Sequence, residues 1–177
     1  FYDTSFSCSS YDNCHVPWGN RHEGTMRHVK NNDFISGQYV WTGFDYIGEP
    51  TPYGWPARSS YFGIIDLAGF PKDVYYMYQS EWRPDKTVLH LFPHWNWTPG
   101  QDIDLWAYYN NADEVELFVN GKSQGVRSKG KDDFHVMWRV KYEPGTVKAV
   151  SRKEGKTVAE QEIRTAGEPA QIRLTPD

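Results

Sequence analysis

The stretch from residue 34 to residue 50, FISGQYVWTGFDYIGEP, constrains the fold more than any other part of the chain. Residues 34–44 are mainly apolar, aromatic or β-branched, and none is charged. Such a run predicts a strand covered on both faces, as in a parallel sheet, and not the alternating pattern of a surface strand. Trp41, Asp45 and Glu49 lie at its C-terminal end. Because sites in α/β folds form at that end of parallel strands, we expect these side chains to face a sugar-sized polar ligand.

A helix is predicted on each side of this strand. The first covers about residues 21–31 and begins at Asn20, with Glu23 three positions later in a capping box. The second covers residues 71–82 and begins with a proline, which suits the first helical position. Residues 50–60 form a loop stiffened by three prolines. Helix, turn and buried strand make one step of a parallel α/β fold. The side chains expected on the buried face of the second helix are Val74, Met77, Tyr78 and Trp82.

From residue 87 the pattern of apolar residues becomes strand-like. Asn120-Gly121 between two β runs predicts a type I′ hairpin, and Glu154-Gly155 predicts a second hairpin turn. Short strands with frequent turns predict a β-sandwich of about the size of an immunoglobulin domain. The expected strands cover residues 88–95, 102–109, 114–119, 125–128, 134–140, 146–152 and 157–164, and a further strand is expected to begin at 170–174.

Composition narrows the choice of partners. The net charge is −4 and the pI is about 5.9, and like charges do not gather in long blocks, so neither nucleic acid nor insertion into a membrane is predicted. No apolar run approaches the roughly 20 residues that a membrane-spanning helix needs. Aromatic residues make up 16% of the chain, and an excess of Trp and Tyr suits both sugar binding and β-rich cores.

The two cysteines, Cys8 and Cys14, leave two interpretations open. They lie close together in a polar segment, so a small loop disulfide and two free thiols both fit. His15 follows directly, but no second ligand pair appears at a recognised spacing. We therefore predict no metal site.

Four strings in the sequence resemble one known family. They are YVWTGFDYIGEPTPY at 39–53, SSYFGIIDLAGFPKD at 59–73, LFPHWNW at 91–97 and ELFVNGKS at 116–123. All four are similar to glycoside hydrolase family 2 β-galactosidases, especially those of Bacteroidetes. The first two resemble the end of the catalytic barrel, and the last two resemble the sandwich that follows it.

The resemblance implies a mixed fold. Its parts are the terminal portion of a (β/α)8 TIM barrel over residues 1–85, an immunoglobulin-like all-β sandwich over 86–166, and a linker into a further domain over 167–177. It also implies hydrolysis of β-glycosides with retention, by a nucleophile glutamate and an acid/base glutamate. Both would precede Phe1, so no catalytic residue is assigned within this chain, and no cofactor is expected.

The resemblance further implies substrate-binding residues at the end of the barrel. Trp41 would stack on the sugar ring, and Asp45 would bind hydroxyls or orient its neighbours. Glu49, Trp55 and Arg58 would form the rim. The alternatives are that Trp41 is a plain core residue and that Asp45 pairs structurally with Arg58 or with a backbone donor. In the sandwich, Trp95, Trp97 and Trp106 are read as core residues in preference to a carbohydrate-binding face.

Three functions therefore stay open. The favoured one is a fragment of a retaining glycosidase that acts on β-galactosides or related β-glycosides and is inactive alone. The alternatives are a non-catalytic carbohydrate-binding or spacer module, and an unrelated compact enzyme using Asp45 and Glu49. An extended backbone would separate those two carboxylates by about 13 Å, whereas a retaining pair needs about 5 Å.

The expected partners are a carbohydrate and the remainder of the parent enzyme, with a homo-oligomer left open. The resemblance suggests a bacterial protein that is periplasmic or secreted, with a cytoplasmic location as the alternative. A partial barrel cannot close its sheet, so the strand at 34–44 should expose unpaired edges unless other parts of the enzyme cover it.

Overall fold

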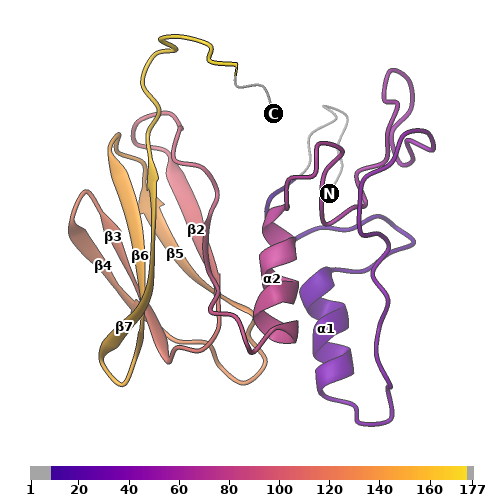
Figure 1. The fold of residues 1–177 in the computed structure, drawn as a ribbon, viewed down its shortest axis with the longest axis horizontal. Helices are drawn as coiled ribbons and strands as arrows, with labels where there is room; N and C mark the ends of the chain where they lie inside the picture. Colours follow the sequence, from indigo (N-terminus) through magenta and orange to yellow (C-terminus); the bar gives the residue numbers. More distant parts are fainter. Residues whose placement is uncertain (1–8, 175–177) are drawn as a thin grey trace.

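The structure, a computed structural model, describes residues 9–174. Figure 1 shows a β-sandwich on one side and two helices on the other, with α2 against the sandwich and α1 beside α2. The helices are α1 (His22–Lys30) and α2 (Asp73–Trp82). The strands are β1 (Leu89–Phe92), β2 (Asp102–Tyr109), β3 (Glu114–Val119), β4 (Lys122–Arg127), β5 (His135–Lys141), β6 (Thr146–Lys153) and β7 (Lys156–Arg164).

The strands form two antiparallel sheets, in the orders β1-β2-β5 and β4-β3-β6-β7. Alternating apolar residues on both sheets point inward, as β3 shows with Val115 and Leu117 fully buried between the partly exposed Glu114, Glu116 and Phe118. The inward side chains pack around Trp95 into one core. The predicted sandwich is therefore confirmed, with all seven strands close to their predicted positions.

The hairpin turns explain why the sequence predicts this half so well. Asn120 and Gly121 adopt φ values of 48° and 78°, which is the type I′ geometry predicted for the β3–β4 turn. Glu154 and Gly155 do the same between β6 and β7, with φ values of 50° and 75°. These turns set the register of the strand pairs through local chemistry alone.

A second core joins the helices to the outer face of the three-stranded sheet. Met77 and Tyr78 of α2 and Met26 of α1 pack against Phe92 and Tyr108 of the sheet. These side chains are buried, so the helical layer and the sandwich form one packed unit. Trp82, which we expected on the buried face of α2, is instead 49% exposed because it lies in the last helical turn, beyond the sheet contact.

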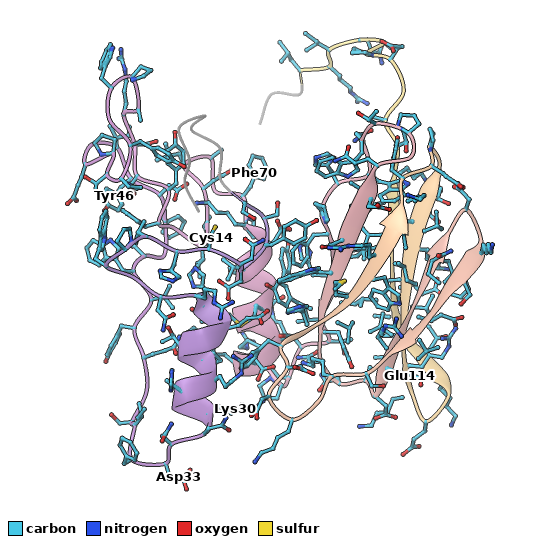
Figure 2. The ribbon with its side chains drawn as sticks, turned by 180° about the vertical axis from the view of Figure 1, so that it is seen from behind. Cys14, Lys30, Asp33, Tyr46, Phe70 and Glu114 are labelled. Atoms are coloured by element: carbon cyan, nitrogen blue, oxygen red, sulfur yellow. The ribbon has the colours of Figure 1, made fainter. Side chains whose placement is uncertain are left out.

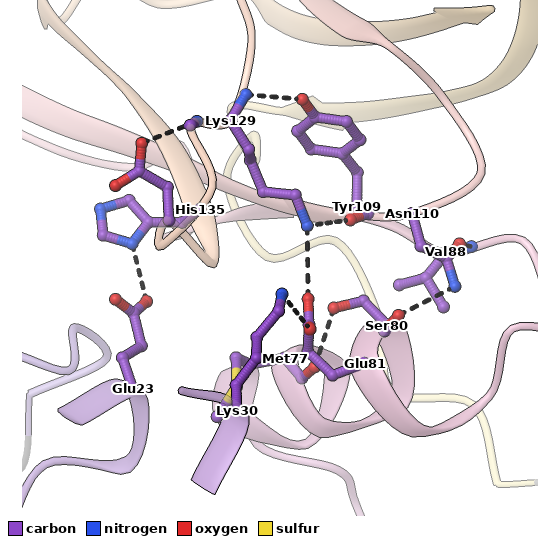
Figure 3. Close-up of polar contacts among 12 residues, drawn as sticks. Glu23, Lys30, Met77, Ser80, Glu81, Val88, Tyr109, Asn110, Lys129 and His135 are labelled. Carbon is purple, nitrogen blue, oxygen red and sulfur yellow. Dashed lines mark hydrogen bonds and ion pairs between the residues drawn. The ribbon is translucent and has the colours of Figure 1, made fainter. Parts of the chain in front are cut away.

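Polar contacts surround this second core (Figure 3). His135 Nδ1 lies 2.7 Å from Glu23 Oε1, and the Nζ atoms of Lys30 and Lys129 lie 3.2 and 3.5 Å from the carboxylate of Glu81. Lys129 Nζ also donates to the carbonyl oxygen of Tyr109 at 2.8 Å. Burial lowers the pKa of Lys129 below its ordinary value. The Glu23–His135 and Glu81–Lys129 contacts link a helix to the sandwich, and the Lys30–Glu81 contact links α1 to α2.

The start of α1 differs from the predicted capping box. Glu23 does not cap the helix, because its carboxylate contacts His135. The capping acceptor is Asp12, whose two carboxylate oxygens accept the backbone N–H groups of His22 and Glu23 at 2.9 and 2.7 Å. A loop residue ten positions upstream thus satisfies the free N–H groups, which the local pattern could not show.

The predicted strands at 34–44 and 170–174 are wrong for this chain. In the described residues neither segment forms a strand. The side chains of Phe34, Tyr39 and Trp41 are largely exposed, although the pattern predicted burial on both faces. The physical reason is the number of neighbours: within residues 9–174, the end of the 34–44 segment pairs on one side only, with residues 62–65. The predicted exposure of unpaired edges is therefore observed.

Candidate functional site

A short parallel pairing positions the candidate site. Thr42 and Asp45 donate backbone N–H groups to the carbonyl oxygens of Phe62 and Ile65 at 3.1 and 2.9 Å. The two segments approach so closely that a Cβ on Gly63 would collide with the backbone nitrogen of Asp45. The glycine therefore allows the contact that fixes the backbone on which Trp41 and Asp45 lie.

Asp45 is buried and held by two donors. Its Oδ1 accepts the backbone N–H of Gly63 at 2.8 Å and the ammonium group of Lys72, also at 2.8 Å. Lys72 Nζ donates in addition to the carbonyl oxygen of Tyr61 at 3.1 Å. Among the described residues, the cation that pairs with Asp45 is therefore Lys72 and not Arg58. This arrangement matches the structural alternative of a backbone donor and adds a lysine that the sequence did not single out.

Trp41 presents its ring to the outside. The side chain is 72% exposed and meets Tyr46 edge to face, with ring centroids 6.2 Å apart. Trp41 Nε1 donates to the Tyr46 hydroxyl at 3.4 Å, and that hydroxyl donates to Glu49 Oε2 at 3.4 Å. The plain core interpretation of Trp41 is therefore wrong for this chain. An exposed ring of this kind can stack on the apolar face of a sugar.

Trp55 and Arg58 form a separate exposed pair. The Arg58 guanidinium lies 4.9 Å from the centre of the Trp55 ring, in a cation–π geometry. The loop that carries them is tied to the Trp41 segment by the Gly48 N–H, which donates to the Arg58 carbonyl oxygen at 2.8 Å. In Figure 2, Tyr46, Cys14 and Phe70 lie at the end of the helical layer where the helices begin, opposite Lys30 and Asp33. Tyr46, which contacts Trp41 and Glu49, is thus at this end of the helical layer.

A cavity of about 260 Å³ opens beside Trp41. Its polar lining includes His22, Gln38 and Tyr78, none of which was predicted as a site residue. His22 Nδ1 lies 2.9 Å from the Tyr78 hydroxyl, and Gln38 Nε2 donates to the same hydroxyl at 3.4 Å. Burial lowers the pKa of His22 and raises that of Tyr78. Gln38 Oε1 is buried without a hydrogen-bond partner among the described residues.

A second cavity of about 300 Å³ lies next to the first and shares the lining residues Cys14, His22 and Tyr61 with it. Asp12 and Lys72 make its wall polar. Cys14 carries a free thiol. Cys8, with which a disulfide was one of the two interpretations, lies outside the described residues. Residues 9–174 contain no cluster of metal-ligating side chains and no helix long and apolar enough to cross a membrane.

The sandwich tryptophans are packed. Trp95 is fully buried and donates its Nε1–H to the Glu143 carbonyl oxygen at 3.0 Å. Trp106 stacks on His135 with ring centroids 3.6 Å apart, and Trp97 packs partly buried against the sandwich core. The interpretation as core is confirmed for Trp95, whereas Trp97 and Trp106 are partly buried against the two cores.

Comparisons with known proteins agree with this arrangement. The model of a domain family described as a domain of unknown function (DUF4982) matches residues 100–159, within the sandwich. The chain is 77% identical over its whole length to the β-galactosidase BoGH2A of Bacteroides ovatus, and it covers 21% of that protein. A β-glycosidase from Bacteroides vulgatus has a similar structure, with a TM-score of 0.84, 37% identity, and coverage of 95% of this chain and 21% of that one. A glycosyl hydrolase family 2 member from Bacteroides cellulosilyticus has a TM-score of 0.73 and 27% identity, with coverage of 86% and 24%.

Proposed function

This chain belongs to glycoside hydrolase family 2, as a segment about one fifth as long as its relatives, and we propose that it forms one wall of a sugar-binding active site. The parent enzyme is proposed to hydrolyse β-galactosides or related β-glycosides with retention. In this proposal residues 1–85 are the terminal portion of a (β/α)8 barrel, residues 86–166 are the accessory sandwich, and 167–177 lead into a further domain.

The observation that carries the proposal is the exposed ring of Trp41 on a fixed backbone. The ring is 72% exposed and lies beside a cavity, while the backbone next to it pairs with residues 62–65. An indole held in this way offers an apolar plate for a sugar ring. Glu49, Trp55 and Arg58 are proposed to line the rim.

The chain alone is proposed to be inactive. Asp45 already accepts hydrogen bonds from Gly63 and Lys72, which favours the role of orienting neighbours over a role in a catalytic carboxylate pair. The two working glutamates are proposed to lie in the part of the enzyme outside this chain. The sandwich is proposed to support the barrel end through α2, because its tryptophans are packed into cores.

Kinetics of the full-length enzyme on a chromogenic β-galactoside test the proposal. Trp41→Ala is expected to lower kcat/KM by at least about tenfold, because the stacking surface is removed. Trp97→Ala, a Trp→Ala change in the sandwich, serves as the control and should leave kcat/KM within about twofold. The isolated chain should show no turnover, and robust hydrolysis by it that Asp45→Asn abolishes would contradict the proposal.

A further inference from the structure

We propose that Lys72 is a positioning residue: by forming an ion pair with Asp45, it holds Trp41 where its ring can stack on a sugar. The inference rests on the proposed function, because it assumes that Trp41 stacks on the substrate. It assigns a role to a lysine at the start of α2, 27 positions after Asp45 in the sequence.

The ammonium group of Lys72 joins two neighbouring segments of the chain. Its Nζ lies 2.8 Å from Asp45 Oδ1 and donates to the Tyr61 carbonyl oxygen at 3.1 Å. The same Oδ1 accepts the Gly63 N–H at 2.8 Å. One ammonium group therefore closes a ring of contacts around the parallel pairing of residues 42–45 with residues 62–65.

Lys72 is itself held in place by α2, which packs on the sandwich. Lys72 is the N-cap residue of α2, and its backbone N–H donates to the Ile64 carbonyl oxygen at 2.9 Å. α2 in turn packs on the sandwich through Met77 and Tyr78, which are buried. The Lys72 side chain thus joins the Trp41 segment to α2 alongside the backbone pairing with residues 62–65, and α2 joins both to the sandwich.

Because Asp45 is buried, its carboxylate needs the ion pair with Lys72 to stay in place. The Asp45 side chain is 5% exposed, and a carboxylate at such a site is costly when its cation is removed. Without Lys72, we expect Asp45 to turn toward water and to move the backbone of residues 41–45 with it. The Trp41 ring would move as well, because its side-chain hydrogen bond is a long one of 3.4 Å to the Tyr46 hydroxyl. Small misplacements at an active site can cost about 100-fold in rate.

A double-mutant cycle in the full-length enzyme tests the inference. The variants are Trp41→Ala, Lys72→Met and the double variant, each assayed for kcat and KM on a chromogenic β-galactoside. We expect Lys72→Met to lower kcat/KM by about 10- to 100-fold. Because both changes act on one ring, the double variant should lose about as much as the larger single loss, and not the product of the two.

Two controls separate positioning from a general loss of structure. Lys141→Met removes an exposed lysine that pairs with Asp102 at 3.0 Å on the sandwich, and it should leave kcat/KM unchanged. Lys72→Arg keeps a cation within reach of Asp45 and should recover kcat/KM to within about threefold of the unmodified enzyme. If Lys72→Met does not fold, Lys72→Gln takes its place in the cycle with the same expectation.

The outcomes are distinct. Unchanged kcat/KM in Lys72→Met, or in Lys72→Gln if that variant takes its place, would overturn the inference while leaving the proposed function intact. Multiplicative losses in the double variant would also overturn it, because Lys72 would then act on something other than Trp41. An unchanged kcat/KM for Trp41→Ala alone would reject the proposed function, and the inference would fall with it.

Discussion

The sandwich and the aromatic segment at residues 34–70 bury their apolar side chains to very different extents. β2 pairs along its length with β1 and β5, and Leu105 and Ala107 in it are fully buried. The end of the 34–44 segment pairs on one side, and Tyr39 is fully exposed. The sandwich therefore buries its apolar side chains within the described residues, whereas the aromatic segment presents surface suited to contacts outside this chain.

The largest expected effect contrasts two tryptophans, one from each region. Trp95→Ala should lower the free energy of unfolding by about 3–5 kcal/mol, because a fully buried ring leaves a cavity. Trp55→Ala, the same change at a side chain that is 78% exposed, should alter it by less than about 0.5 kcal/mol. Urea unfolding followed by circular dichroism measures both. Equal losses for the two variants would remove the contrast between the regions.

The second prediction concerns the contact between α2 and the sandwich. Met77→Ala should cost about 2–4 kcal/mol, because Met77 is fully buried where α2 meets the three-stranded sheet. Amide hydrogen exchange should show the loss in α2 more strongly than in β6, which lies in the other sheet. A uniform loss across all strands would mean that the helices and the sandwich unfold as one unit.

A smaller effect is expected at the start of α1. Asp12→Ala should cost about 1 kcal/mol, because it leaves the N–H groups of His22 and Glu23 without their acceptor. Asp33→Ala, an Asp→Ala change at an exposed residue after α1, is the matched control and should be nearly neutral. Exchange rates of the first amides of α1 report the difference, and identical rates in both variants would argue against Asp12 as the cap.

The smallest effect is electrostatic and confined to the sandwich. The Arg139 guanidinium bonds both carboxylate oxygens of Asp104 at 2.7 Å and lowers the pKa of that carboxyl. A carboxyl with a lowered pKa adds stability above its ordinary pKa, and that contribution is lost as the pH falls through the folded-state pKa. Arg139→Gln should return the Asp104 pKa toward its ordinary value, as measured by its carboxyl ¹³C shift against pH. Lys141→Gln should leave that pKa in place, and a rise of the same size there would contradict the assignment to Arg139.

The same contrast explains what the sequence could predict. The strands and hairpins of the sandwich follow from alternation and turn residues such as Asn120-Gly121, which act over a few positions. The capping role of Asp12 and the Lys72–Asp45 contact join residues far apart in sequence, so no local pattern reveals them. The segment at 34–44 carries the pattern of a buried strand, but such a strand needs neighbours on both edges. The roles of Trp41, Asp45, Glu49, Trp55 and Arg58 toward a substrate stay predictions.

Hydrogen exchange of the isolated chain and of the full-length enzyme tests the central claim most directly. The account predicts that amides of β2, β3 and β6 are strongly protected in both samples. It predicts that amides at 34–41 exchange rapidly in the isolated chain and become protected in the full-length enzyme. Strong protection of residues 34–41 in the isolated, monomeric chain would contradict the account.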